Sequence, residues 1–118
     1  MKTALDPRHK KRQDIVQLLF SYSFLDQKIN NEKAKLIISK HSEIDSTVKV
    51  IAPEFPIEKI NKVDLAILRL AIYELQFEKE APPKVIVDEA IELAIQQAED
   101  GDVAFDPDDI DIVKARVI

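Results

Sequence analysis

A nearly continuous apolar stretch, Val63–Leu75, dominates the hydrophobic pattern of this chain. Only three polar side chains, those of Asp64, Arg69 and Glu74, interrupt it. A helix with so little polar surface is typical of the hidden centre of a helical bundle rather than of its surface. We therefore predict a central helix over residues 62–77.

Amphipathic segments flank this central helix on both sides. Their apolar residues recur at three- and four-residue spacing, which is the repeat of a helix with one buried face. Several of them begin with an N-cap residue or with a proline in the first helical position. The predicted helices cover residues 7–25, 32–39, 43–51, 83–98 and 106–116, with a brief turn of helix at 56–60. Because no stretch predicts a strand convincingly, we expect an all-α bundle of six or seven helices.

Composition agrees with one helical domain and excludes several other classes. The chain has 118 residues, an ordinary size for a single domain, so we treat residues 1–118 as one domain. Its single glycine argues against β-hairpins and glycine-rich phosphate loops. It has no cysteine, which excludes disulfides and thiolate zinc sites. With no apolar signal-peptide core and no run of about 20 apolar residues, we expect a soluble cytoplasmic protein without membrane contact.

The net charge of −5 conceals a strong asymmetry along the chain. Residues 1–12 carry a net charge of +4, residues 13–63 are balanced, and residues 64–118 carry −9. A basic head on an acidic body is typical of a protein with one anionic and one cationic partner. Solubility alone is the alternative explanation.

Catalytic chemistry finds little support in this sequence. His9 and His41 are isolated and belong to no metal-ligand spacing, so both are interpreted as surface imidazoles. The serines lack the flanking glycines of a nucleophile elbow. The acidic stretch from Asp100 to Asp111 lacks the ligand pattern of a calcium loop. We therefore expect neither an enzyme nor a cofactor.

The basic run at residues 8–12, RHKKR, is the clearest chemical signal. Arg8, Lys11 and Arg12 are spaced at i, i+3 and i+4, so they share one face of the first helix, and Lys10 widens the patch. Cations at a helix N-terminus oppose the helix dipole, which makes a functional reason for them more plausible. Such a stripe can neutralise phosphates, and we interpret it as a nucleic-acid contact.

Three strings of residues resemble the NusB family of bacterial transcription antitermination factors. The first is Arg12 followed by VQLLFSY at residues 16–22. The second is the central VDLAILRLAIYEL at residues 63–75. The third, within residues 82–94, contains Pro82, a Lys-Val pair and DEAIELA. The last two strings are specific together and cover most of the second half of the chain.

The resemblance implies a fold and a function. Members of the family have two small helical subdomains joined by the central helix. They bind the boxA segment of nascent rRNA leader RNA jointly with NusE, a ribosomal small-subunit protein. The resulting transcription elongation complex reads through terminators. By this resemblance the basic start of the first helix faces RNA and the acidic body faces NusE, while some members of the family also form homodimers.

Site residues follow from the basic run, the resemblance and the apolar helices together. The candidates for RNA contact are Arg8, Lys10, Lys11, Arg12, Phe20 and Phe105, with a place in the core as the alternative for Phe20. Asp64 and Asp100 are candidates for partner contact, with ordinary surface carboxylates as the alternative. Arg69, Glu74 and Glu89 interrupt otherwise apolar helices. We expect Arg69 to pair with one or both of these glutamates, because buried charges need partners.

Departures from the family pattern leave a second function open. Phe20 replaces a family tyrosine and Asp88 a family asparagine. The C-terminal family motif K-F-V-N-G is absent, although Phe105 can stand for its phenylalanine. The alternative is thus a stand-alone helical protein-interaction domain with weakened or lost boxA recognition. A third alternative is a relative of the NusB-like domain that precedes rRNA cytosine methyltransferases, where we again expect no catalysis in this chain.

Overall fold

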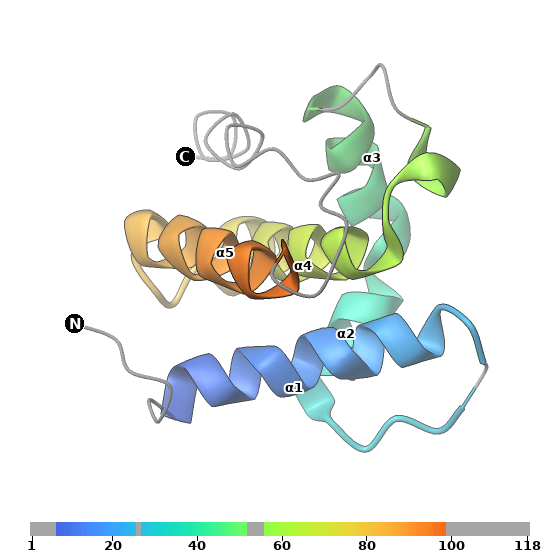
Figure 1. Ribbon diagram of the computed structural model, residues 1–118, viewed down its shortest axis with the longest axis horizontal. Helices are drawn as coiled ribbons and strands as arrows, with labels where there is room; N and C mark the ends of the chain where they lie inside the picture. Colours follow the sequence, from blue (N-terminus) through green and yellow to red (C-terminus); the bar gives the residue numbers. More distant parts are fainter. Residues whose placement is uncertain (1–6, 26, 52–55, 99–118) are drawn as a thin grey trace.

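The computed structural model describes residues 7–25, 27–51 and 56–98, and the regular elements within them are all helical (Figure 1). They are α1 (Pro7–Tyr22), α2 (Glu32–Ser39), α3 (His41–Ile51), a 3₁₀ turn η1 (Ile57–Lys59), α4 (Lys62–Tyr73), a π-helical turn η2 (Glu74–Glu78) and α5 (Pro83–Ala98). No strand occurs in these three ranges. The predicted all-α class is therefore confirmed for the described part of the chain.

Helix α4 is the centre of the bundle. Nine of its 12 residues are buried, and α1, α2, α3 and α5 all contact it. In Figure 1, α5 runs alongside α4, while α1 and α3 lie on opposite sides of the pair. The near-absence of a polar face on this helix is explained by these neighbours, because each covers a different side of it. The predicted central helix is confirmed.

Asparagine caps set where two of the helices begin. The Asn61 side chain accepts hydrogen bonds from the backbone N–H groups of Val63 (2.9 Å) and Asp64 (3.4 Å) at the start of α4. The Asn31 side chain accepts one from Ala34 (2.9 Å) at the start of α2. An N-cap of this kind satisfies N–H groups that have no partner within the helix.

The C-terminal end of the central helix differs from the prediction. The α-helical pattern stops at Tyr73, and one π-helical turn, η2, continues the chain to Glu78. Lys79 then adopts a left-handed conformation (φ 55°), and its N–H donates to the Glu74 carbonyl at 2.8 Å. Single π turns inside helices often occur at functional sites. Here the turn contains Glu74, whose side chain is only 1% exposed.

Apolar residues of every α-helix and of the α1–α2 loop form one core. The core residues of highest burial outside α4 are Ala34, Ile37, Ile44, Val48, Ile86 and Ala90, and Ile29 joins the core from the loop. A fully buried aliphatic side chain of this size contributes about 1.5–3 kcal/mol. The helical fold therefore rests on apolar packing around α4 more than on the helix propensity of any one segment.

Several boundaries differ slightly from the predicted ones. Helix α1 ends at Tyr22, three residues early, and α3 begins at His41, two residues early. The predicted helix at residues 106–116 lies outside the described residues, and the division into two subdomains remains a prediction. None of the helices in the described ranges is both long enough and apolar enough to span a membrane.

Candidate functional site

A buried ion pair ties the basic start of α1 to the end of the central helix. Arg12 donates from Nε to Glu74 Oε2 (3.0 Å) and from Nη2 to Glu74 Oε1 (2.7 Å). The exposed fractions are 11% for Arg12 and 1% for Glu74. A two-pronged arginine–carboxylate pair is among the strongest and most directional contacts available to side chains. Arg12 thus holds α1 against η2, a structural role that the sequence analysis did not assign to it.

The surroundings of Arg12 favour its charged form. Burial by itself lowers the pKa of the guanidinium, but the hydrogen bond from Arg12 to Glu74 and the charges of Glu74, Glu89 and Glu78 raise it above its ordinary value. Arg12 Nη1 also lies 4.0 Å from Glu89 Oε1 on α5. The cation therefore links three segments, α1, η2 and α5, and stays charged throughout the physiological pH range.

Lys33 completes this network from α2. Its Nζ lies 3.3 Å from Glu74 Oε2 and donates to Glu78 Oε1 at 3.0 Å. The side chain is 26% exposed, so it is both a partner of the buried Glu74 and part of the surface. Two cations from different helices thereby share one carboxylate. Lys33 is absent from the predicted site residues, because nothing in the sequence pattern near it shows that α2 packs next to η2.

His9 is buried, contrary to the expected surface imidazole. It is 2% exposed, and its Nδ1 lies 2.7 Å from Glu89 Oε2 on α5. Gln96 Nε2 lies 3.2 Å from His9 Nε2, and Gln13 Nε2 donates to Gln96 Oε1 at 3.1 Å. Since an ionised carboxylate only accepts, Nδ1 carries the proton towards Glu89, and Nε2 accepts from the Gln96 amide. His41, by contrast, is exposed as predicted.

Arg69 pairs with Asp45 of α3, so the predicted pairing with Glu74 or Glu89 is wrong. Its Nε and Nη2 donate to the two Asp45 oxygens at 2.9 and 2.8 Å. The physical reason is that Arg69 leaves the central helix on the side facing α3, while Glu74 faces α1 and α2. Arg69 and Asp45 are 23% and 18% exposed, so this pair is only partly buried.

Replacing Arg69 by alanine is accordingly expected to lower the free energy of unfolding by about 1–2 kcal/mol, less than a fully buried pair would cost. Chemical denaturation of the variant and of Asp45→Ala checks this, because both changes break the same two hydrogen bonds. A double variant that costs as much as the sum of the two single variants would show that the pair does not couple.

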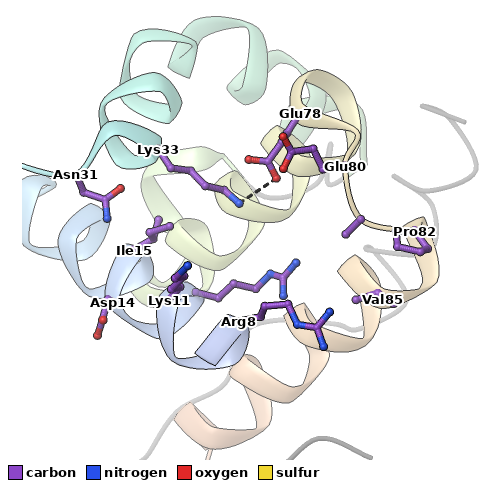
Figure 2. A pocket seen from close by; sticks show the side chains of 12 residues that line it. Arg8, Lys11, Asp14, Ile15, Asn31, Lys33, Glu78, Glu80, Pro82 and Val85 are labelled. Carbon is purple, nitrogen blue, oxygen red and sulfur yellow. Dashed lines mark hydrogen bonds and ion pairs between the residues drawn. The ribbon is translucent and has the colours of Figure 1, made fainter. Parts of the chain in front are cut away.

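Beside the buried network lies a groove with a basic side (Figure 2). The cavity has a volume of about 650 Å³ and lies between α1, the start of α2, η2 and the start of α5. It is lined by Arg8, Lys11, Arg12, Asp14, Ile15, Asn31, Lys33, Glu78, Glu80, Ala81, Pro82 and Val85. Figure 2 shows Arg8 and Lys11 of α1 and Lys33 of α2 around the same space, with the carboxylates of Glu78 and Glu80 along the rim.

The structure brings only part of the predicted RNA-contact set together. Arg8, Lys11 and Arg12 line the groove, as their shared helix face predicted. Lys10 is not among the groove residues: it is 66% exposed and lies 3.3 Å from Asp14, which does line the groove. Arg8 and Lys11 are exposed and Arg12 is mostly covered, so the first two carry the accessible charge.

Phe20 belongs to a different surface. It is half-buried, packs edge-to-face against Phe24 at a centroid distance of 5.0 Å, and lines a separate cavity of about 370 Å³. Both alternatives for Phe20, core packing and base stacking, therefore keep some support, but it does not share the basic groove. Phe105 and Asp100 lie outside the described residues.

Asp64 is a buried carboxylate, so its predicted role in partner contact is wrong, and so is the alternative of an ordinary surface carboxylate. It is 1% exposed and lies in the first turn of α4. An acid in the first turn interacts favourably with the helix dipole. Its side chain therefore contributes to the interior rather than to an exposed face.

The described residues form an all-helical bundle around an apolar central helix, with a basic groove beside a buried arginine–glutamate pair, and these features define the class of protein. Comparison with known proteins makes the class specific. The family model for the NusB family matches residues 9–105. The chain belongs to the NusB family of transcription antitermination proteins, which are not enzymes.

Individual relatives agree with this assignment. The transcription antitermination protein NusB of Agathobacter rectalis is 32% identical over an alignment of 120 positions, which covers 83% of this chain and 92% of that protein. The proteins of the same name from Clostridium botulinum (strain Loch Maree) and Shewanella amazonensis are 50% and 47% identical over 60 and 64 residues. Those two matches span 51% and 53% of this chain but only 43% and 47% of the relatives. No solved structure shows significant similarity to this chain.

Proposed function

We propose that this protein binds boxA RNA of nascent rRNA transcripts together with the ribosomal protein NusE, as part of a transcription elongation complex. The observation that carries the proposal is the groove in which Arg8, Lys11 and Lys33 converge from two helices. Convergent cations of this kind neutralise phosphates and release counterions. The family assignment supplies the expected class of RNA, and the whole chain, residues 1–118, is proposed to act as one cytoplasmic RNA-binding domain.

The buried network supports this role indirectly. Arg12 of α1 is held by Glu74, and Lys33 of α2 is held by Glu74 and Glu78, so both helices are tied by ion pairs to the same turn, η2. The exposed cations Arg8 and Lys11 on the same turns of α1 are thereby presented on a fixed surface. Preorganised charges bind phosphates with a smaller entropy cost than charges on a mobile arm.

The charge distribution supports a second, basic partner. Residues 64–118 carry a net charge of −9, and the exposed carboxylate of Asp88, outside the groove, belongs to this half. Complementary potentials raise association rates and select partners. We propose that this acidic half faces NusE, with Asp100 as a candidate contact. Exposed apolar side chains such as Phe24 (60%) and Leu25 (70%) offer an alternative use of the surface, which is self-association into a homodimer.

One titration separates this function from that of a stand-alone interaction domain. The full chain is titrated with boxA RNA and with a scrambled RNA of equal length, each with and without NusE. We expect preference for boxA, and we expect this preference to require NusE. Equal binding of both RNAs under all four conditions would contradict the proposal and support the stand-alone domain, and the absence of the C-terminal family motif K-F-V-N-G would then explain the loss of boxA recognition.

A further inference from the structure

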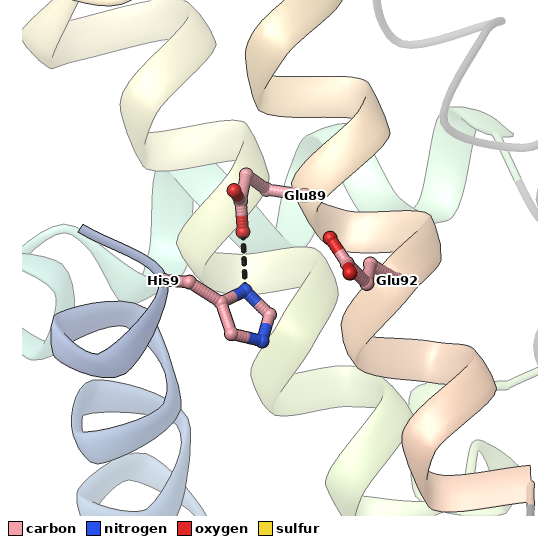
Figure 3. A group of neighbouring side chains, drawn as sticks. All are labelled: His9, Glu89 and Glu92. Atoms are coloured by element: carbon pink, nitrogen blue, oxygen red, sulfur yellow. Dashed lines mark hydrogen bonds and ion pairs between the residues drawn. The ribbon is translucent and has the colours of Figure 1, made fainter. Parts of the chain in front are cut away.

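Three side chains of the kinds that ligate metals converge between α1 and α5, outside the basic groove. They are His9, Glu89 and Glu92, and one nitrogen or oxygen atom of each lies within 4.8 Å of the others. Figure 3 shows the His9 ring extending from α1 towards the two carboxylates of α5. His9 and Glu89 are 2% and 3% exposed, while Glu92 is half-buried, so the cluster opens to solvent on one side.

We propose that this cluster binds one Zn²⁺ ion, through His9 Nδ1 and one oxygen each of Glu89 and Glu92. Imidazole nitrogen and carboxylate oxygen are regular zinc ligands, with bonds of about 2.0–2.2 Å. Tetrahedral geometry at that bond length separates ligand atoms by roughly 3.3 Å. The ligand atoms lie within 4.8 Å of one another, so zinc binding requires the half-buried Glu92 side chain to move closer to His9 and Glu89. Three protein ligands leave the fourth position to water.

The backbone already places the three ligands. Glu89 and Glu92 are three residues apart on α5, so they lie on one face of that helix, one turn from each other. His9 comes from the first turn of α1, and the short distance of 2.7 Å to Glu89 fixes its ring over that face. Ligands on two packed helices lose little freedom when they bind an ion, which favours tight binding.

The neighbouring glutamines fit the role of supporting groups. A ligating imidazole usually has its second ring nitrogen held by a hydrogen bond, and Gln96 already occupies that position next to His9 Nε2. When zinc takes the place of the proton on Nδ1, the proton of the neutral ring moves to Nε2. The amides of Gln96 and Gln13 then turn together, so that Gln96 accepts from the Nε2–H group and donates to Gln13. The hydrogen bonds of this chain are thereby kept, and no net proton is gained or lost.

The ligand set also selects the kind of metal. Mg²⁺ and Ca²⁺ prefer sites made of oxygen atoms, whereas an imidazole favours the later first-row metals and zinc. A bound zinc ion would connect the first turn of α1 to α5, close to the turns that carry Arg8 and Lys11. The proposal does not depend on RNA binding, since none of the three ligands lines the groove.

Thermal unfolding of the full chain with increasing ZnCl₂, in a buffer that does not chelate metals, tests the proposal. We expect Tm to rise by roughly 10 °C when free zinc is one hundred times Kd, and we expect no rise with MgCl₂. Titration with Zn²⁺, followed by the absorption of bound Co²⁺ as it is displaced, gives the stoichiometry. One ion per chain is the expected value.

Matched variants assign the binding to the cluster. Glu92→Gln removes one ligand at a half-exposed position without breaking the His9–Glu89 contact, so the variant should fold. Its zinc affinity should fall by at least roughly tenfold, because even removal of a supporting partner costs about that much. Asp88→Asn removes a neighbouring exposed carboxylate of α5 and should leave zinc affinity unchanged. No Tm shift for the unmodified chain, or equal zinc affinity in Glu92→Gln and Asp88→Asn, would overturn the proposal.

Discussion

Replacing Glu74 by alanine is expected to lower the free energy of unfolding by about 3–5 kcal/mol, the cost of removing one partner from a buried ion pair. Glu74 is 1% exposed and accepts two hydrogen bonds from Arg12, which is itself only 11% exposed. Without the carboxylate, the Arg12 guanidinium stays largely buried and loses its main partner. Lys33 also loses one of its two carboxylates. Chemical denaturation followed by circular dichroism measures the change.

Two further variants separate the ion pair from the simple loss of side-chain volume. Glu78→Gln removes the more exposed carboxylate of the network (20% exposed), so it should cost less than about 1 kcal/mol. The double variant Arg12→Met with Glu74→Met replaces both buried charges by apolar groups of similar length. It should recover much of the stability, since a buried ion pair can often be exchanged for apolar packing at little cost. If Glu74→Ala were no more destabilising than Glu78→Gln, the buried network would not hold the fold.

The double variant Arg8→Ala with Lys11→Ala is expected to weaken boxA RNA binding by roughly tenfold at physiological salt, provided that each cation neutralises one phosphate. The slope of log affinity against log salt concentration should become shallower by about 1.4, because each phosphate neutralised on single-stranded RNA adds roughly 0.7 to it. Both side chains are exposed, so the thermal stability should stay close to that of the unmodified chain. RNA titrations at four salt concentrations and one melting curve give all three quantities.

The control for this variant has the same charge change elsewhere on the protein. Lys49→Ala with Lys62→Ala removes two exposed lysines from α3 and from the start of α4, neither of which lines the groove. Its RNA affinity should fall by much less. Equal decreases in the two double variants would mean that net charge, and not the groove, determines RNA binding.

Much of the fold followed directly from the pattern of apolar residues. The stretch 63–75 predicted a buried central helix because it left no polar face, and α4 is buried on nearly all sides. Asn31 and the proline at residue 83 marked helix starts that the structure keeps. The π turn at residues 74–78 could not be predicted in this way, since five residues are too few to show an apolar repeat of their own.

Pairing between charged residues was the least predictable feature. The sequence shows that Arg69 and Glu74 both need partners, but it does not show from which side of the central helix each side chain projects. Their partners lie 24 and 62 residues away, Asp45 on α3 and Arg12 on α1. His9 was misplaced for the same reason, because its partner Glu89 is 80 residues distant. These contacts depend on how helices far apart in the sequence pack together, and a single sequence does not show which helix faces meet.

The candidate site was predicted in part. The spacing of Arg8, Lys11 and Arg12 correctly gave one face of α1, and all three line the groove. The spacing could not show that Arg12 forms a buried ion pair with Glu74, or that Lys33 of α2 lines the same groove. The most specific part of the family resemblance came from the segment 63–94, which holds the fold. The accessible cations of the groove lie on α1 and α2.

The central claim is that the cations that bind RNA lie on α1 and α2, whereas the segment 63–94 holds the fold. The most direct test is an amide chemical-shift map of the full, isotope-labelled chain. The chain is titrated with boxA RNA in the presence of unlabelled NusE, and the spectra are compared with those recorded with NusE alone. We expect that addition of RNA causes the largest chemical-shift changes at residues 8–11, with further changes around Asn31 and Lys33 and at residues 80–82. Largest changes on α3, with the start of α1 unaffected, would contradict this claim.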